Sequence, residues 1–241
     1  MRYKAVVSYD GSLFYGFQRL NEERTVQKEI EKALSIINKK DVKIKGASRT
    51  DKGVHAYGQV IHFDLDVVVP LDRLLKAVNR ILPNDVRIVD IDSVDKDFHA
   101  RHLAIGKKYV YRINLGTYSV FFDKYYLQYP YKIDIDKMKS TSKDFLGVHN
   151  FKNYTAGLRD NYTSKIDSIE FNLNSNILEI TFVGKSFYRY MVRNMVGAML
   201  DVARNKVRLS EIKSSIDNPN IEKRFSTASA NGLYLMEVYY E

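Results

Sequence analysis

The chain contains no cysteine and no tryptophan, and only four of its 241 residues are proline. The lack of cysteine excludes disulfide bonds, thiol nucleophiles and thiolate-bound zinc. Long hydrophobic runs are also missing, since no stretch reaches the roughly 18 apolar residues that a membrane-spanning helix needs. The first residues lead directly into an alternating strand pattern without an apolar signal segment. We therefore expect a soluble protein that acts in the cytoplasm and does not bind a membrane.

Histidine is scarce, with five residues at positions 55, 62, 99, 102 and 149. None of them belongs to a His-Glu-x-x-His cluster. His99 and His102 are three residues apart, but no third ligand follows nearby. Because a metal site needs several converging ligands, the sequence predicts no metal site.

Positive charge is in excess: 38 lysines and arginines stand against 29 aspartates and glutamates, which gives a net charge of +9. Such an excess is typical of proteins that bind a polyanion. With 45% hydrophobic and 12% aromatic residues, the chain has enough apolar surface to fold. Its length suits one large domain or two small ones.

Hydrophobic periodicity predicts the order βαββαβ in residues 1–105. The predicted elements are a strand at 2–9, a helix from Thr25, strands on both sides of Asp51, a helix at 70–82 and a strand at 85–92. The same order recurs in residues 106–241, with strands at 107–115, 166–173, 177–183 and 233–240, helices at 134–146 and 187–205, and insertions at 116–133 and 210–217. We therefore expect an α+β protein with two ferredoxin-like or RRM-like halves, 1–105 and 106–241.

One carboxylate, Asp51, stands in a short loop between two predicted strands, within the segment 45–60. A turn held by two strands fixes a side chain at the exposed edge of a rigid sheet, where catalytic groups work best. Gly53 lets the backbone turn sharply at this point. An Asp-x-Gly turn is common on its own, so the surrounding residues decide what it means.

The full segment resembles the signature of the tRNA pseudouridine synthase A family, which reads close to G-A-G-R-T-D-A-G-V-H-A-x-G-Q-V. The chain matches this signature at Gly46, Ala47, Arg49, Thr50, Asp51, Gly53, Val54, His55, Ala56, Gly58, Gln59 and Val60. It departs at Ser48, where the family usually has glycine, and at Lys52, where it usually has alanine. Neither departure removes a chemical group that the reaction needs.

Two further motifs extend the resemblance over essentially the whole chain. The strand at 107–112 is similar to a basic-x-Tyr-x-Tyr motif, whose first tyrosine, here Tyr109, contacts the target uracil. The segment 187–197 resembles a helix motif, M-V-R-N-x-V-G, whose arginine, here Arg193, pairs with the catalytic aspartate. The usual histidine before the methionine of that motif is Tyr190 here, and Gly197 leaves room for another chain or a ligand. Taken alone, Tyr109 would be a packed strand aromatic and Arg193 a solvated helix charge.

The resemblance implies an isomerase that converts uridine to pseudouridine in the anticodon stem-loop of tRNA, typically at positions 38 to 40, without a metal or other cofactor. It also implies a homodimer, and two halves joined into one extended, mainly antiparallel sheet with the active-site cleft between them. Asp51 would be the nucleophile or the base, Arg193 its ion-pair partner, and Tyr109 a base contact and proton relay. The expected substrate-binding residues are Arg49, Lys52, His55, Arg101, Lys107, Lys108, Tyr109 and Arg189.

Two other classes of protein share some of these features. A non-catalytic RNA-binding protein with paired RRM-like halves would have the same element order, but the chain has no good match to the RNP1 pattern. A metal-dependent nuclease would need clustered carboxylates, whereas Asp51 stands alone in its loop. Both alternatives are therefore less favoured than the synthase.

Overall fold

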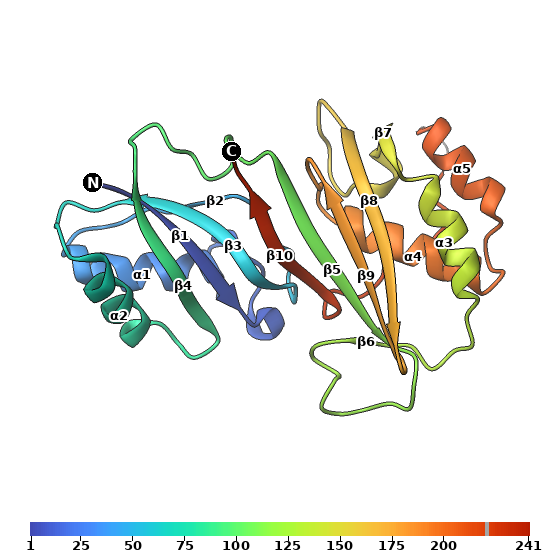
Figure 1. Ribbon diagram of the computed structural model, residues 1–241, viewed down its shortest axis with the longest axis horizontal. Coiled ribbons are helices and arrows are strands. Elements are labelled where there is room, and N and C mark those ends of the chain that lie inside the picture. The colour runs from blue at the N-terminus through green and yellow to red at the C-terminus, as the bar shows by residue number, and fades with distance from the viewer. Residues whose placement is uncertain (220–221) are drawn as a thin grey trace. The chain divides into compact units, whose positions relative to one another are not determined.

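The computed structural model describes residues 1–219 and 222–241. The chain divides into two compact units, the first made of residues 1–105 with 234–241 and the second of residues 106–233. Figure 1 labels the helices and strands along the chain.

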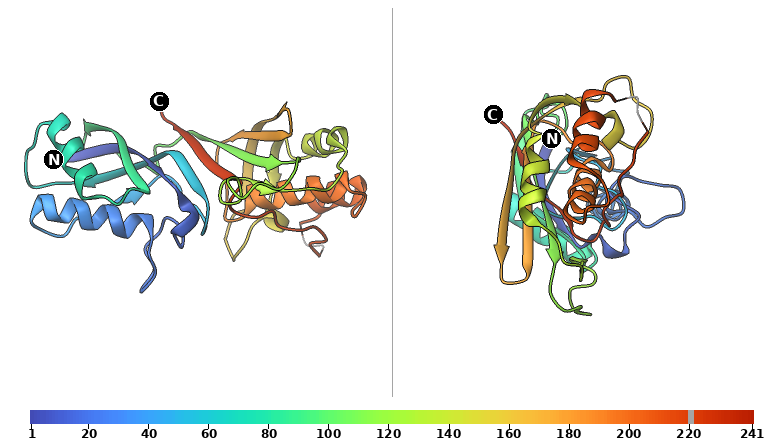
Figure 2. Two further views of the ribbon diagram at one scale, coloured as in Figure 1. Left: turned by 90° about the horizontal axis from the view of Figure 1, so that it is seen from below. Right: turned by 90° about the vertical axis from the view of Figure 1, so that its right-hand side faces the viewer.

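Unit 1 is an α+β layer whose strands lie in the order β4-β1-β3-β10, with the short β2 paired to β3. Its α1 lies along one face of the strands (Figure 2). In β1 alternate residues are buried, which is the pattern of a strand with one face on a core. The elements are β1 (Arg2–Tyr9), the 3-10 helix η1 (Gly11–Leu13), α1 (Val26–Asn38), β2 (Lys45–Gly46), β3 (His55–Asp64), α2 (Leu71–Ile81), β4 (Val86–Val94) and β10 (Leu233–Tyr239).

Unit 2 repeats the layered plan with strands in the order β5-β9-β8-β7 and the short β6 paired to β5. Its α4 runs along one face of these strands (Figure 2), and α3 packs against α4. Twelve of the 13 residues of α4 are buried, so this helix is the centre of the core of unit 2. The elements are β5 (Gly106–Asn114), β6 (Leu127–Gln128), α3 (Ile135–Lys143), β7 (Gly147–Asn150), the 3-10 helix η2 (Lys152–Tyr154), β8 (Thr163–Asn174), β9 (Ile177–Gly184), α4 (Met191–Ala203) and α5 (Leu209–Asp217).

The predicted fold class is confirmed, since helices pack on mainly antiparallel strands in both units. The predicted helix at 187–205 is too long: α4 begins at Met191, because Tyr190 adopts a left-handed conformation with φ of +65°. The predicted helix at 134–146 ends at Lys143, and Gly147 opens the unpredicted β7. Strands of two or four residues such as β6 and β7 are too short to produce a periodic signal.

The last strand lies in unit 1, although its place in the sequence assigns it to the second half. It pairs parallel with β3 through Tyr234 opposite His55 and Leu235 opposite Ala56. Gly58 makes this approach possible, because a Cβ atom there would lie 2.2 Å from the carbonyl oxygen of Met236. Alternating hydrophobicity identifies a strand but does not identify its partner.

Candidate catalytic site

Asp51 is the first residue of a tight turn between β2 and β3 in unit 1. The N–H of Val54 donates to the Asp51 carbonyl at 3.1 Å, and Gly53 stands at the third position with φ of +80°. A positive φ at that position is typical of a type II turn and favours glycine. Asp51 itself is half-buried. The turn therefore presents the carboxylate at the end of a rigid strand pair.

A second loop, residues 14–17, clamps this turn from the side. Phe17 donates its N–H to the carbonyl of Thr50 at 3.1 Å, and Gly53 donates to the carbonyl of Phe14 at 3.3 Å. A Cβ atom on Gly16 would lie 2.8 Å from the Thr50 carbonyl oxygen, so only glycine allows this approach. The backbone on both sides of Asp51 is thus fixed by the loop that precedes α1.

Two buried side chains hold the start of the turn. Gln59, which is fully buried on β3, accepts a hydrogen bond from the N–H of Ser48 at 3.1 Å and donates to the Ser48 carbonyl at 2.9 Å. The hydroxyls of Tyr9 and Thr50 lie 2.7 Å apart in the core. These contacts explain physically why a glutamine belongs eight residues after the aspartate.

The basic residues beside Asp51 point to solvent. Arg49 and Lys52 are both exposed, and the Lys52 ammonium lies 3.6 Å from the centre of the Tyr15 ring. Cations and an exposed aromatic ring next to a carboxylate form a surface that suits a nucleotide.

His55 has a different environment, because it is only 2% exposed. Its Nδ1 accepts the N–H of Gly11 at 3.1 Å, and its ring stacks on that of Tyr234 at 4.7 Å. These contacts join η1, β3 and β10. They favour a role for His55 in holding the turn rather than in touching RNA.

Arg101 lies in an exposed loop that three histidines support. The buried His62 accepts the N–H of Ala100 at Nδ1, and His99 accepts the N–H of Arg101 at Nδ1, both at 3.1 Å. The rings of His99 and His102 lie 4.0 Å apart. Burial lowers the pKa of His62 to about 4, with a further contribution from His99, so His62 is neutral near pH 7.

In unit 2, Tyr109 lies on β5 and is 5% exposed. Its ring packs edge-to-face on Phe187, with centroids 5.1 Å apart. Its neighbour Lys107 is also buried, at 8% exposed, whereas Lys108 is half-buried and Arg189 is exposed. Among these predicted RNA-binding cations of unit 2, Arg189 is the one on the surface.

Arg193 is half-buried, and contacts within unit 2 hold its side chain. Its Nε donates to the carbonyl of Ala228 at 2.8 Å, and its guanidinium carbon lies 4.6 Å from the centre of the Tyr190 ring. The guanidinium carbon of Arg189 lies 5.0 Å from the same ring. Arg193 is thus a fixed side chain rather than a solvated helix charge.

The segment 223–229 covers the polar side of α4. A Cβ atom on Gly197 would lie 2.0 Å from the carbonyl oxygen of Ser226, so the space expected to take another chain or a ligand is filled by a segment of this chain. The side chain of Asn194 accepts hydrogen bonds from Lys223 at 2.8 Å and Thr227 at 2.6 Å. Burial, together with the charge of Arg193, lowers the pKa of Lys223.

The structure therefore groups the predicted residues within each unit. Asp51 and Lys52 lie in one turn of unit 1 and Arg49 two residues before it, and the segment 187–190 links Tyr109 to Arg193 in unit 2. Sequence reasoning missed Lys223 and the Ala228 carbonyl, because neither carries a motif, although Gly197 signals that a backbone passes there. Within the described residues, no group of three or more His, Cys, Asp or Glu side chains could hold a metal ion.

Comparison with known proteins gives the family. The family model described as tRNA pseudouridine synthase matches residues 5–102 and 142–241. The chain belongs to this family. It is 39% identical to tRNA pseudouridine synthase A of Streptococcus uberis, over 100% of this chain and 98% of the relative, and 39% identical to that of Bacillus pumilus, over 100% of both. The predicted family is confirmed, and with it the prediction of an isomerase that acts on tRNA uridine.

A chain in the crystal structure of a Cbf5-Nop10-Gar1 complex aligns with 97% of this chain and 58% of its own length, at 12% identity and a TM-score of 0.35.

Among the helices that the structure describes, none combines the length and the apolar character that crossing a bilayer would require. The family membership disfavours the non-catalytic RNA-binding protein and the metal-dependent nuclease.

Proposed function

We propose that the chain converts uridine to pseudouridine in the anticodon stem-loop of tRNA, at positions 38 to 40. The observation that carries the proposal is the turn of Asp51, whose backbone is clamped on both sides in a chain of the pseudouridine synthase family. The reaction breaks the bond between the sugar and a uracil nitrogen, turns the base, and rejoins it through carbon. No atom is gained or lost, so the chain's own side chains can supply the chemistry.

Asp51 acts as the nucleophile or as the base that starts the reaction. Arg193 is its ion-pair partner and keeps the carboxylate charged once RNA excludes water. Fixation of the Arg193 guanidinium by Ala228 and Tyr190 supports this role, because a planar cation pairs well with a carboxylate only in a defined orientation. Tyr109 contacts the flipped uracil, and Arg49 enters the space that the base leaves.

Asp51→Ala tests this assignment. We expect it to abolish pseudouridine formation in an unmodified tRNA transcript, measured by mass spectrometry, while RNA affinity changes by only a few fold, since phosphate contacts supply most of the affinity. The matched control is Asp136→Ala, which removes a carboxylate that is 94% exposed at the start of α3. Residual turnover in Asp51→Ala above about a hundredth of the wild-type rate would remove Asp51 from this role.

The protein also forms a homodimer under this proposal. An exposed apolar segment at 118–125 supports self-association, with Val120 70% and Phe121 83% exposed. The hydrogen bonds from the side chain of Asn231 to the carbonyls of Asp123 and Tyr126 hold this segment in place. Sedimentation of the wild type and of Phe121→Asp tests it: a dimer that becomes a monomer supports the proposal, and a monomeric wild type contradicts it.

Under the same proposal the enzyme acts in the cytoplasm, where its tRNA substrate is found.

A further inference from the structure

A cationic groove lies in unit 1 between α1 and the segment 39–43. Its volume is about 490 Å³ and it is open to solvent. Six cationic side chains line it, against two acidic ones, Glu31 and Asp41. The cations, here called the groove cations, are Arg19, Lys28, Lys32, Lys39, Lys40 and Lys43.

Four of the five groove lysines make no ion pair within the part of the chain that the structure describes. Lys28 and Lys32 are one helical turn apart on α1, where like charges destabilise a helix. Within residues 1–219 and 222–241, ion pairs involve only two groove cations: Arg19 pairs with Glu31, and Lys40 with Asp66 at 2.8 Å. An anionic ligand would offset the remaining repulsion.

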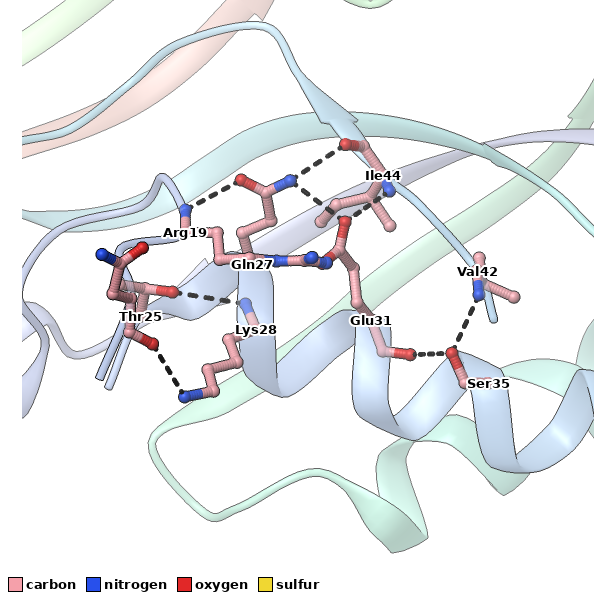
Figure 3. Close-up of polar contacts among 9 residues, drawn as sticks. Arg19, Thr25, Gln27, Lys28, Glu31, Ser35, Val42 and Ile44 are labelled. Carbon is pink, nitrogen blue, oxygen red and sulfur yellow. Dashed lines mark hydrogen bonds and ion pairs between the residues drawn. The ribbon is translucent and has the colours of Figure 1, made fainter. Parts of the chain in front are cut away.

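A buried polar network fixes the floor of the groove (Figure 3). The carboxylate of Glu31, a residue that is 4% exposed, accepts hydrogen bonds from the N–H of Ile44 and the side chain of Gln27, both at 3.0 Å, and pairs with Arg19. One turn further along α1, Ser35 accepts the N–H of Val42 at 2.9 Å. Hydrogen bonds thus join α1 to the backbone at Val42 and Ile44, so the groove lysines stand on a rigid base.

The groove starts beside the catalytic turn and leads away from it. The first residues of α1 donate hydrogen bonds to the loop that clamps the turn of Asp51, from Val26 to Gly16 and from Gln27 to Phe17. Along α1, Lys39 lies about 17 Å beyond Lys28, at 1.5 Å for each residue. The cations are therefore spread over a length that suits an extended polyanion better than a single small anion.

We propose that this groove binds the sugar-phosphate backbone of tRNA. The inference rests on the proposed function for the identity of the polyanion. It adds an RNA-binding surface made of residues that lie outside the catalytic motifs. Lysines suit this task because each neutralises a phosphate without demanding one fixed geometry.

Lys32→Gln with Lys43→Gln tests the proposal. Single-turnover pseudouridine formation is followed on an unmodified tRNA transcript while the enzyme concentration is varied. We expect the half-saturating enzyme concentration to rise about tenfold, the plateau rate to stay at the wild-type value, and the slope of log affinity against log salt to fall by about two. The matched control is Lys76→Gln with Lys139→Gln, which removes two exposed lysines from α2 and α3.

The outcomes separate the groove from the reaction. If the variant Lys32→Gln with Lys43→Gln and the control Lys76→Gln with Lys139→Gln bind tRNA equally in fluorescence anisotropy, the groove does not bind tRNA. This holds whatever the activity of the two variants. A wild type that binds tRNA through the groove lysines but forms no pseudouridine would overturn the proposed function and leave the groove in place. A variant with normal half-saturation and a lower plateau would also overturn the groove proposal.

Discussion

The aromatic ring of Tyr190 lies 4.6 Å from the guanidinium carbon of Arg193, and the same residue holds its backbone at φ of +65°. A bulky side chain in this conformation is uncommon and costs about 1 kcal/mol or more. Tyr190 is the left-handed residue that directly precedes α4. This conformation lets Arg193, three residues later, contact the tyrosine ring. Backbone strain at Tyr190 therefore accompanies the fixed position of the Arg193 guanidinium.

Substitution at Tyr190 should separate stability from activity. Asparagine tolerates the left-handed conformation, which offsets the loss of the ring contacts, so Tyr190→Asn should stay within about 1 kcal/mol of the wild type in thermal unfolding. It removes the ring over Arg193, and the single-turnover rate should fall about tenfold, since cation–π contacts contribute roughly 0.5–2 kcal/mol and orientation adds to the loss. Tyr190→Phe is the control and should keep the wild-type rate. An active Asn variant would show that the ring does not orient Arg193.

Gly197→Ala should displace Arg193 through its hydrogen bond to the carbonyl of Ala228. The new Cβ would lie 2.0 Å from the Ser226 carbonyl oxygen, so the segment 223–229 must move away from α4. Ala228, whose carbonyl accepts the Arg193 Nε–H, would move with it. We expect a loss of about 1–3 kcal/mol in urea unfolding together with a lower rate. An unchanged unfolding midpoint would contradict this packing.

Gln59→Met tests the support of the Asp51 turn. The two side chains have similar volumes, but methionine cannot replace the two hydrogen bonds to Ser48. A buried N–H and a buried carbonyl would lose their partners, at a cost of about 1–3 kcal/mol each. We expect lower stability and a reduced rate with little change in tRNA affinity. Gln18→Met, at an exposed glutamine of the same unit, is the control.

The sequence predicts the motif residues better than the contacts that support them. Asp51 stands inside a long motif, and period-two and helical patterns locate β1, α1 and β3. The conformation of Tyr190 is not readable, because a left-handed residue before a helix leaves no hydrophobic period. The approach of residues 223–229 to α4 is equally hidden, since a long-range backbone contact is signalled only by Gly197. The groove lysines are visible in the sequence, but only the fold brings Lys28 of α1 and Lys43 of the segment 39–43 to the same groove.

The histidine cluster beside Arg101 should make the stability of the protein depend on pH. His62 accepts the Ala100 N–H at Nδ1, and its pKa falls to about 4 through burial and, secondarily, the charges of His99 and Arg2. In the unfolded chain a histidine titrates near pH 6.5. Between about pH 6.5 and 4 the unfolded state therefore binds a proton that the folded state does not. The free energy of unfolding should fall over this range as the pH is lowered.

His62→Asn isolates this contribution. Its side-chain oxygen can accept the Ala100 N–H in place of Nδ1, but it does not titrate. Urea unfolding at pH 7 and pH 5 should show a smaller loss of stability for the variant than for the wild type. Part of the loss should remain, because burial also lowers the pKa of His99. If the free energy of unfolding depends on pH equally in the two proteins, His62 is not the source of that dependence. The contact between His62 and the Arg101 loop would then not depend on pH.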